Sequence, residues 1–212
     1  MRIIRQLLVF AVVVTLSPPS FACAQNFYAA VRGGPGWTPD VSIGLVGGQD
    51  PVSFTTGFTG SGTVGYAAAS GLRVEGEFGY IYAPVNREEG ASITGSIKDY
   101  LAMANLYYDL KTAALGPFKP YVGFGVGGAR VNEDRQTVFT TTGARVGIDQ
   151  WRTAFAYQGR LGLGYDVNPW LDLSAGYRYV HVTGGDRTNG GFVIRSDGLD
   201  NHSLELGAAF KF

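Results

Sequence analysis

Charged side chains recur at alternate positions inside apolar, glycine-rich runs of this sequence, and they are its main candidates for chemistry. Arg73, Glu75 and Glu77, for example, are spaced two residues apart. In an extended strand, residues two apart point to the same face. Carboxylates and guanidinium groups that share a face can form paired hydrogen bonds, because the Arg fork matches a carboxylate. The spacing therefore predicts an ion-pair network.

A second candidate is the segment that holds His202, Ser203 and Glu205, residue types that can act as base, nucleophile and acid. Adjacent residues of a strand point to opposite faces, so His202 and Ser203 cannot form a nucleophile with its base. We expect His181 to be an interfacial residue. The glycines of GFGVGG lie inside a strand pattern and open no helix, which a nucleotide fingerprint requires. We therefore predict no catalytic residue, metal or cofactor.

The elements that must position these residues are strands. Eight runs of about 10 residues alternate between apolar and polar side chains, which is typical of strands with two different faces. No stretch shows a sustained helical period with caps. The predicted strands are Asn26–Trp37, Ser61–Ala69, Leu72–Tyr82, Lys98–Leu110, Pro120–Val131, Thr153–Val167, Leu171–Thr183 and Asn201–Phe212.

The connections alternate between long and shorter segments. Ser70-Gly71 and Asn168-Pro169-Trp170 are tight turn signals, whereas Thr38–Gly60 and Asn132–Arg152 are long. In an up-and-down meander, all long connections then lie at one end, and the turns and both termini at the other. An even number of such strands with this asymmetry predicts an all-β fold, an eight-stranded antiparallel up-and-down transmembrane β-barrel. Closure is required because hydrocarbon cannot satisfy an open sheet edge.

The N-terminus has the pattern of a secretory signal peptide. A basic start precedes the apolar run Leu7–Leu16, and small residues flank a cleavage site after Ala24. The run is too short to span a membrane as a helix. We predict that residues 1–24 are removed and that residues 25–212 form one barrel domain. An alternative at the same place is lipoprotein processing, with Cys23 lipidated instead of removed.

Composition narrows the class of protein further. Loss of Arg2 and Arg5 with the leader leaves 15 basic and 17 acidic residues, so nothing indicates a nucleic-acid partner. The predicted mature chain has no cysteine and hence no disulfide framework. The 32 glycines are about twice the usual share. They recur inside strands, as at Gly123, Gly125 and Gly127, which suits a tightly curved sheet whose inner face has no room for side chains.

Four segments carry a family resemblance: FYAAVRGGPGW, GPFKPYVGFGVGGARV, FAYQGRLGLGYDVNPWLDLSAGYRY and LELGAAFKF. Over the whole mature chain, the sequence resembles the OmpA-like and opacity-type eight-stranded outer-membrane β-barrels of Gram-negative bacteria. The resemblance implies extracellular loops and periplasmic termini. It also implies that the final strand, with Phe210 and Phe212, is an assembly signal. Because the chain stops at the eighth strand, we expect no peptidoglycan-binding periplasmic domain.

The barrel gives the ion-pair network a location. Alternate residues of a strand share a face, and we call each such set a parity. If the apolar parity faces lipid, the charged parity faces a bore that side chains just fill. Buried charges in that bore must pair. We expect a network that blocks the bore, formed by Arg32, Arg73, Glu75, Glu77, Arg160, Arg178 and Glu205. Each glutamate should pair with Arg32, Arg160 or Arg178. Charges of the same parity near the strand ends are expected to be solvated: Asp99, Asp109, Asp172 and Lys211.

The sequence thus predicts a non-enzymatic outer-membrane protein that supports envelope integrity, adhesion or host contact through long loops. One alternative is a small porin that passes ions or small solutes. Another is a soluble periplasmic barrel whose apolar parity faces inward and binds an apolar ligand. Expected partners are outer-membrane lipid including lipopolysaccharide, the barrel-assembly machinery and, through the loops, host surface molecules. The protein is expected to be a monomer.

Overall fold

The structure is a computed structural model, and it describes residues 26–39, 41–45, 48–52, 56–87, 91–110, 115–139, 145–189, 192–196 and 198–212. The predicted signal peptide lies outside the described residues, so its cleavage stays a prediction. In the part of the chain that is described, no helix has the length and hydropathy needed to cross a membrane.

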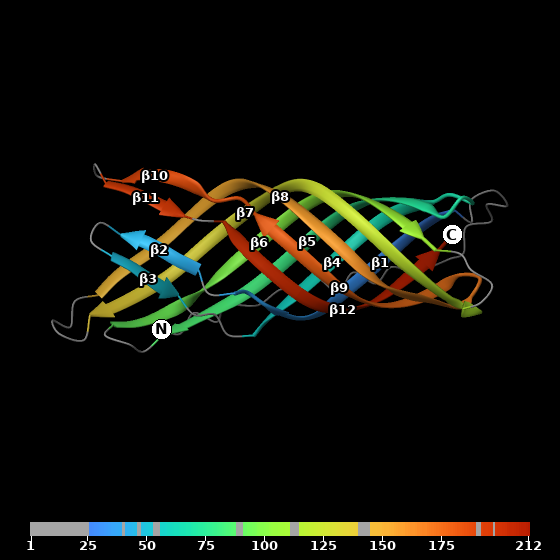
Figure 1. Cartoon of the computed structure of the whole chain (residues 1–212), viewed down its shortest axis with the longest axis horizontal. Coiled ribbons are helices and arrows are strands. Elements are labelled where there is room, and N and C mark those ends of the chain that lie inside the picture. The colour runs from blue at the N-terminus through green and yellow to red at the C-terminus, as the bar shows by residue number, and fades with distance from the viewer. Residues whose placement is uncertain are drawn as a thin grey trace, which may run out of the picture.

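Eight antiparallel strands close into a single barrel, which confirms the predicted fold. Each barrel strand pairs with the barrel strands before and after it in the chain. The first and last strands, β1 and β12, pair with each other and so close the barrel; β1 also pairs with β4. The strands cross the barrel obliquely in Figure 1. They are β1 (Phe27–Trp37), β4 (Gly57–Ala67), β5 (Leu72–Arg87), β6 (Ala91–Asp109), β7 (Phe118–Phe139), β8 (Arg145–Asn168), β9 (Leu171–Val182) and β12 (Leu199–Lys211).

The two ends of the barrel differ, and we call them the turn end and the loop end. The turn end carries the connections β4–β5, β6–β7 and β8–β9 together with the C-terminus (Figure 1). Asn168 closes one of these turns, because its Oδ1 accepts hydrogen bonds from the backbone N–H groups of Trp170 and Leu171 at 3.0 and 2.9 Å. Gly71 closes another with a φ of +95°, which favours glycine.

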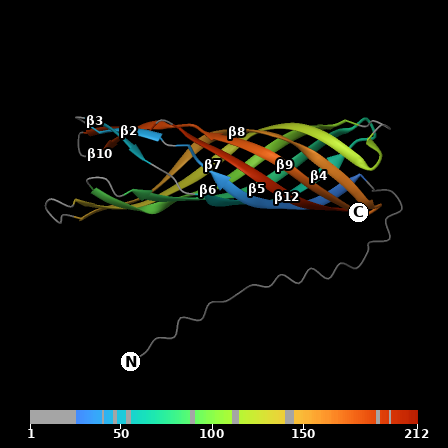
Figure 2. The ribbon, with the colours of Figure 1, turned by 60° about the horizontal axis from the view of Figure 1, so that its bottom comes forward.

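The long connections contain more regular structure than the sequence predicts. The first holds β2 (Val41–Leu45) and β3 (Gly48–Val52), and the last holds β10 (Gly185–Asn189) and β11 (Phe192–Ser196). These strands form a four-stranded sheet in the order β10-β11-β2-β3 at the loop end. Figures 1 and 2 show this sheet as an extension beyond the barrel.

The strands β5 to β8 also run past their predicted ends. The β7–β8 pairing continues as far as Val138 opposite Arg145, so the interpretation of Asn132–Arg152 as a loop was wrong for most of that segment. Strand pairing needs only backbone groups in register, and it can therefore continue where the apolar–polar alternation that reveals a membrane strand has stopped.

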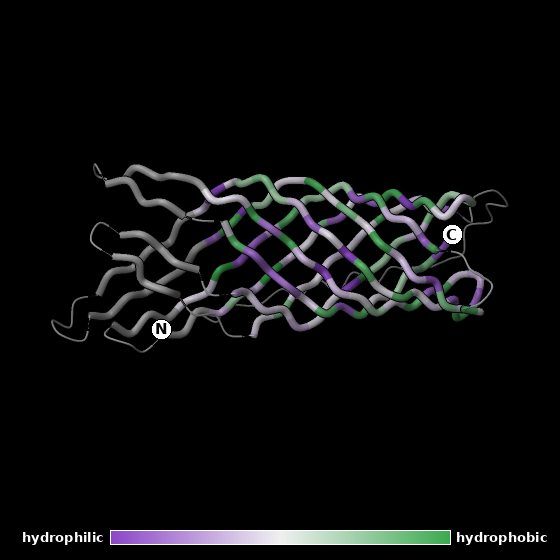
Figure 3. The backbone as a smooth tube through the Cα atoms, in the orientation of Figure 1, coloured by the Kyte–Doolittle hydropathy of each residue, from purple (hydrophilic) through white to green (hydrophobic). Residues whose placement is uncertain are grey.

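The apolar parity faces outward. Val64, Phe78 and Leu206 are 65, 62 and 72% exposed. Figure 3 shows hydrophobic and hydrophilic residues alternating along the tube through the barrel. The inward parity instead carries the buried charges. The arrangement expected of a soluble ligand-binding barrel, with the apolar parity inside, is therefore not the one found.

The inner face has little free room at its glycines, as their recurrence predicted. A Cβ added to Gly123 would collide with the ring of Tyr107, and one added to Gly125 with the amide of Asn105. Glycine at these positions lets larger side chains from the neighbouring strand β6 cross the bore.

The half of the lumen toward the loop end has an apolar filling that the parity analysis did not predict. Leu101, Val180 and Ala156 are fully buried there. The cluster comprises Ile81, Ala83, Ile97, Leu101, Met103, Ala129, Val131, Ala156, Val180, Val182 and Leu199. Buried polar side chains, among them Thr59, Asp99 and Asn201, lie beside this cluster in the same half of the lumen.

Candidate functional site

The centre of the lumen holds two carboxylates and two guanidinium groups from four strands. Glu77 on β5 accepts hydrogen bonds from Arg160 on β8 at 2.5 and 3.1 Å and from Arg178 on β9 at 2.9 Å. Glu205 on β12 accepts hydrogen bonds from Arg160 at 3.0 Å and from Arg178 at 3.4 Å. We call these four residues the central cluster. Its formal charges cancel, which is the condition under which buried charges are tolerated.

Uncharged side chains complete the central cluster. Asn105 donates a hydrogen bond to Glu77 at 2.8 Å, and Gln158 donates one to Asn105 at 2.6 Å. Gln158 also accepts a hydrogen bond from Arg178 at 2.8 Å. Tyr107 is close enough for its hydroxyl to accept a hydrogen bond from Arg160 at 2.7 Å. The two carboxylates and two cations are therefore held in fixed positions by a shell of amides and a phenol.

A second group of charges lies on the side of the turn end, and we call it the turn-side cluster. Glu75 accepts a bidentate pair of hydrogen bonds from Arg32 at 2.7 and 2.9 Å. Tyr28 donates a hydrogen bond to the same carboxylate at 2.5 Å. Arg73 bridges Glu75 at 3.2 Å and Asp109 at 2.8 Å. These two arginines and two carboxylates again cancel in charge.

Tyr107 joins the two clusters. Its hydroxyl bonds to Arg160 of the central cluster, while the guanidinium carbon of Arg73 lies 4.9 Å from the centre of its ring. A cation over a Tyr ring is attracted by the negative face of the π-system. The charges of the two clusters therefore form one connected network that spans strands β1, β5, β6, β8, β9 and β12.

The structure brings all seven of the lumen residues chosen from the sequence into these two clusters: Arg32, Arg73, Glu75, Glu77, Arg160, Arg178 and Glu205. Sequence reasoning missed their uncharged partners Tyr28, Asn105, Tyr107 and Gln158. These side chains have the inward parity, but an amide or a phenol on that parity does not indicate a partner as a charge does.

The expectation that the charges near the strand ends are solvated was wrong for Asp99, which is fully buried. Asp109 belongs to the turn-side cluster through Arg73. Asp172 and Lys211 pair at 2.7 Å and are about a quarter exposed, so they are only partly solvated. Position near a strand end therefore did not predict solvation, because the strands continue or pair beyond it.

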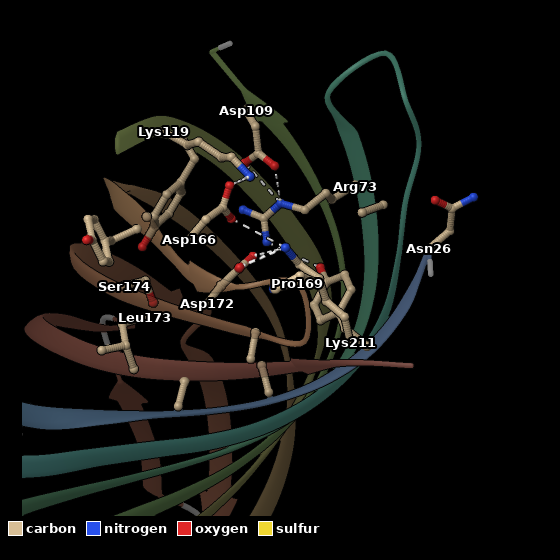
Figure 4. Close-up of a pocket in the computed structure, with 18 of the residues that line it drawn as sticks. Asn26, Arg73, Asp109, Lys119, Asp166, Pro169, Asp172, Leu173, Ser174 and Lys211 are labelled. Atoms are coloured by element: carbon tan, nitrogen blue, oxygen red, sulfur yellow. Dashed lines mark hydrogen bonds and ion pairs between the residues drawn. The ribbon is translucent and has the colours of Figure 1, made fainter. Parts of the chain in front are cut away.

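A cavity of about 330 Å³ opens into the turn end, between the turn-side cluster and a charged rim. Lys211 lies 3.4 Å from Asp166, which also pairs with Lys119. Figure 4 shows the side chains of this mouth converging, among them Arg73, Asp109, Lys119, Asp166, Asp172 and Lys211. The mouth is thus polar but its charges are mutually paired.

His202 and Ser203, which were considered as a base and a nucleophile, lie on opposite sides of the barrel wall. Ser203 is fully buried on the lumen side. His202 faces outward, where its ring stacks on Trp37 at 5.9 Å and its Nδ1 lies 2.5 Å from the hydroxyl of Tyr177. Of the described residues, no group of three or more His, Cys, Asp or Glu could hold a metal ion.

The two residues of the proposed assembly signal both lie on the outer surface. Phe210 stacks on Trp170 with ring centres 6.3 Å apart, and the backbone N–H of Phe212 donates to the carbonyl of Phe27 at 2.9 Å. The final strand is thus tied to the first strand at the turn end.

A closed eight-stranded barrel with an apolar exterior and a charged lumen is the form of an outer-membrane barrel. The family model described as an outer membrane protein beta-barrel domain matches residues 8–212. The chain belongs to this family. It is therefore an outer-membrane protein, and the recognised resemblance to eight-stranded outer-membrane barrels is confirmed.

One curated relative has a name that agrees with this assignment, and a second is uncharacterised. An outer membrane protein of Gluconacetobacter diazotrophicus is 32% identical over 179 residues, which cover 74% of this chain and 47% of the relative. An uncharacterised protein of Brucella abortus is 39% identical over 93 residues, 41% of this chain and 31% of the relative. The chain thus spans half the length, or less, of these relatives.

Solved structures show the same fold at low sequence identity. Neisserial surface protein A is 22% identical with a TM-score of 0.53, and the match covers 88% of this chain and 97% of that one. The outer membrane protein OprG of Pseudomonas aeruginosa is 15% identical with the same TM-score, over 89% and 97% of the two chains.

Proposed function

We propose that this outer-membrane barrel is a non-enzymatic structural and surface protein whose lumen is closed and whose loop-end segments contact the surroundings of the cell. The observation that carries the proposal is the filled bore. The central cluster and the turn-side cluster cross it, and the apolar cluster together with buried polar side chains such as Asp99 occupies the half beyond them. A bore of eight strands is just wide enough for its own side chains.

The proposal includes an orientation, with the loop end outside the cell and the turn end in the periplasm. Long segments at one end and tight turns at the other are the usual asymmetry of such barrels. The sheet of β2, β3, β10 and β11 enlarges the surface at the loop end. One structural relative is itself called a surface protein.

A role without catalysis is supported by the separation of His202 from Ser203 across the barrel wall. Glu205 does not act as the acid of such a set, because it pairs with Arg160 and Arg178. A nucleophile needs a base within hydrogen-bond reach, and this set does not supply one.

Conductance in planar lipid bilayers tests whether the lumen is closed. The purified full chain should give no stable current steps. The double variant Glu77→Ala/Arg178→Ala removes one charge of each sign from the central cluster, and it should give small steps if the clusters form the barrier. Large steps from the unaltered chain would replace the proposal with the porin function.

Contact through the loop-end segments needs a separate experiment in cells. A strain that lacks the protein can be complemented with the full chain or with a variant in which residues 41–52 and 185–196 are replaced by short Gly-Ser linkers. We expect the variant to restore resistance of the envelope to a hydrophobic dye but not adhesion to surfaces. Adhesion equal to that of the full chain would exclude these segments as the contact surface.

A further inference from the structure

Two cations face outward at the loop-end edge of the band of exposed apolar side chains that surrounds the barrel. Arg130 continues the outward parity of Val126 on β7 and is exposed, and Lys98 has the outward parity of Tyr100 on β6. Tyr100 pairs with Arg130 in the ladder, and Lys98 pairs with Asn132, so the two cations are diagonal neighbours. Neither has an ion-pair partner among the described carboxylates. A charge on the outer surface of a membrane strand is costly at the midplane but not near the interface, so these two cations fit the interface, where lipid head groups can bind them.

Aromatic rings hold Arg130 in place. Its guanidinium carbon lies 4.9 Å from the centre of the Trp151 ring. Trp151 also stacks on Tyr100 at 5.9 Å, and Tyr100 contacts Tyr80 at 5.2 Å. Trp and Tyr residues gather at the depth where lipid head groups meet the hydrocarbon. The two cations therefore lie at head-group depth, with Arg130 ordered in advance by its contact with Trp151.

An apolar groove lies on the outer surface next to Arg130 and Trp151. The ladder aligns Phe78, Ala102, Gly128 and Phe155 in one row across four strands. The two rings at the ends of the row are more than half exposed, and the two small residues between them form the floor. A Cβ added at Gly128 would meet only the Ala154 carbonyl, at 3.9 Å, so the space above this floor is open.

We propose that this surface binds a phosphorylated glycolipid of the lipid A type, with its phosphates on Arg130 and Lys98 and one acyl chain in the groove over Ala102 and Gly128. Charge and shape both point to this occupant. A guanidinium binds phosphate oxygens in a bidentate manner, and an ammonium adds a second cation for a lipid that carries two phosphates. The site rests on the proposed orientation, in which the loop end lies in the outer leaflet.

Native mass spectrometry of the full chain in detergent micelles tests the site without depending on orientation. The probe is lipid A with both phosphates, compared with the same lipid after enzymatic dephosphorylation. The double variant Lys98→Gln/Arg130→Gln should bind the phosphorylated lipid at least roughly tenfold more weakly, since it loses charge-assisted hydrogen bonds. Lys119→Gln at the turn end loses a positive charge far from the groove and should bind as the unaltered chain does.

A second pair of variants tests the groove. Gly128→Leu fills its floor and should weaken binding of phosphorylated lipid A several-fold. Gly159→Leu places the same side chain on the outer surface of β8, where a Cβ would have nothing within 4 Å, and should leave binding unchanged. Both variants should fold, because both side chains project into open space.

Three results would overturn the site. The first is equal binding of the phosphorylated and the dephosphorylated lipid. The second is displacement of the lipid by inorganic phosphate at equal concentration, which would indicate a simple anion site. The third is a dimer in detergent that Gly128→Leu abolishes, which would give the groove to a second copy of the chain. Antibody staining of intact cells that showed the inverse orientation would place the site in the inner leaflet and would overturn lipid A as its occupant in the cell, whereas binding measured in micelles would still describe the surface itself.

Discussion

At the scale of single residues, the lumen is held by buried charges that pair with one another. Arg178 is fully buried and donates to Glu77, Glu205 and Gln158. A buried ion pair can be replaced by apolar residues at little cost in stability, but removal of one partner leaves an unpaired buried charge. Single substitutions in the central cluster should therefore be more damaging than the simultaneous removal of a neutral pair.

Glu77→Ala or Arg160→Ala should each lower the free energy of unfolding by roughly 3–5 kcal/mol, because each leaves the buried central cluster with an uncompensated net charge. Urea unfolding in lipid vesicles, followed by the change in gel migration between folded and heated protein, measures this. Lys119→Ala at the partly exposed rim is the control and should cost about 1 kcal/mol or less. A loss as small as the control's for Glu77→Ala would mean that water enters the clusters.

Phe212→Ser should reduce the amount of protein assembled in the outer membrane far more than Lys211→Ser. The aromatic side chain at the end of the outward parity is half exposed and is proposed to be read by the assembly machinery, whereas the Lys211 ammonium pairs with the rim carboxylates of Asp166 and Asp172. Quantitative blotting of outer-membrane fractions compares the two. Equal yields would remove Phe212 from the assembly signal.

Parity on strands predicted which charges lie together, because closure of a narrow barrel leaves inward charges no other place. It did not predict which outward residues carry chemistry. Arg130 was overlooked because it interrupts an apolar parity near the end of its predicted strand, where a charge looks like the start of a loop. The phenol of Tyr107 was overlooked because a tyrosine on the inner face is indistinguishable from an ordinary core residue.

At the scale of elements, the depth of a residue on a strand decides the cost of a charge. Leu206 and Leu173 both face outward, but at different depths. Leu206 pairs with Gly33 and Ala175 in the middle of the barrel wall, whereas Leu173 pairs with Tyr165 near the turn end. Leu206→Arg should cost roughly 2–4 kcal/mol in lipid vesicles, and Leu173→Arg about 1 kcal/mol or less, since the penalty falls toward the interface. Equal unfolding free energies for the two variants would contradict the assigned depths.

The membrane strands were predictable from alternation, but the hairpins at the loop end were not. Strand β3 reads GQDPV and includes Pro51, and β10 reads GDRTN with no apolar residue. Proline and a fully polar pattern both argue against a strand when a sequence is read alone. Such segments gain their pairing from neighbours that the barrel brings close, such as β11 against β2.

At the scale of the whole molecule, orientation is the property most open to a direct test. An epitope inserted between β7 and β8 should be stained by antibody on intact cells, because this connection lies at the loop end. The same epitope at Ser70-Gly71 should be stained only after the outer membrane is permeabilised. Staining of the second insertion on intact cells, without staining of the first, would invert the proposed topology.

The ion pairs of the central cluster also bear on how long the folded barrel lasts. Glu77 is 83 residues from Arg160 and 101 residues from Arg178 along the chain, so these contacts can form only when the barrel is nearly closed. Interactions that form after the rate-limiting step slow unfolding without speeding folding. If closure is that late, the loss of roughly 3–5 kcal/mol in Arg160→Ala should appear as an unfolding rate raised by roughly two to four orders of magnitude, with the folding rate almost unchanged. The ion pairs of the lumen would then slow unfolding and so set the lifetime of the inserted protein.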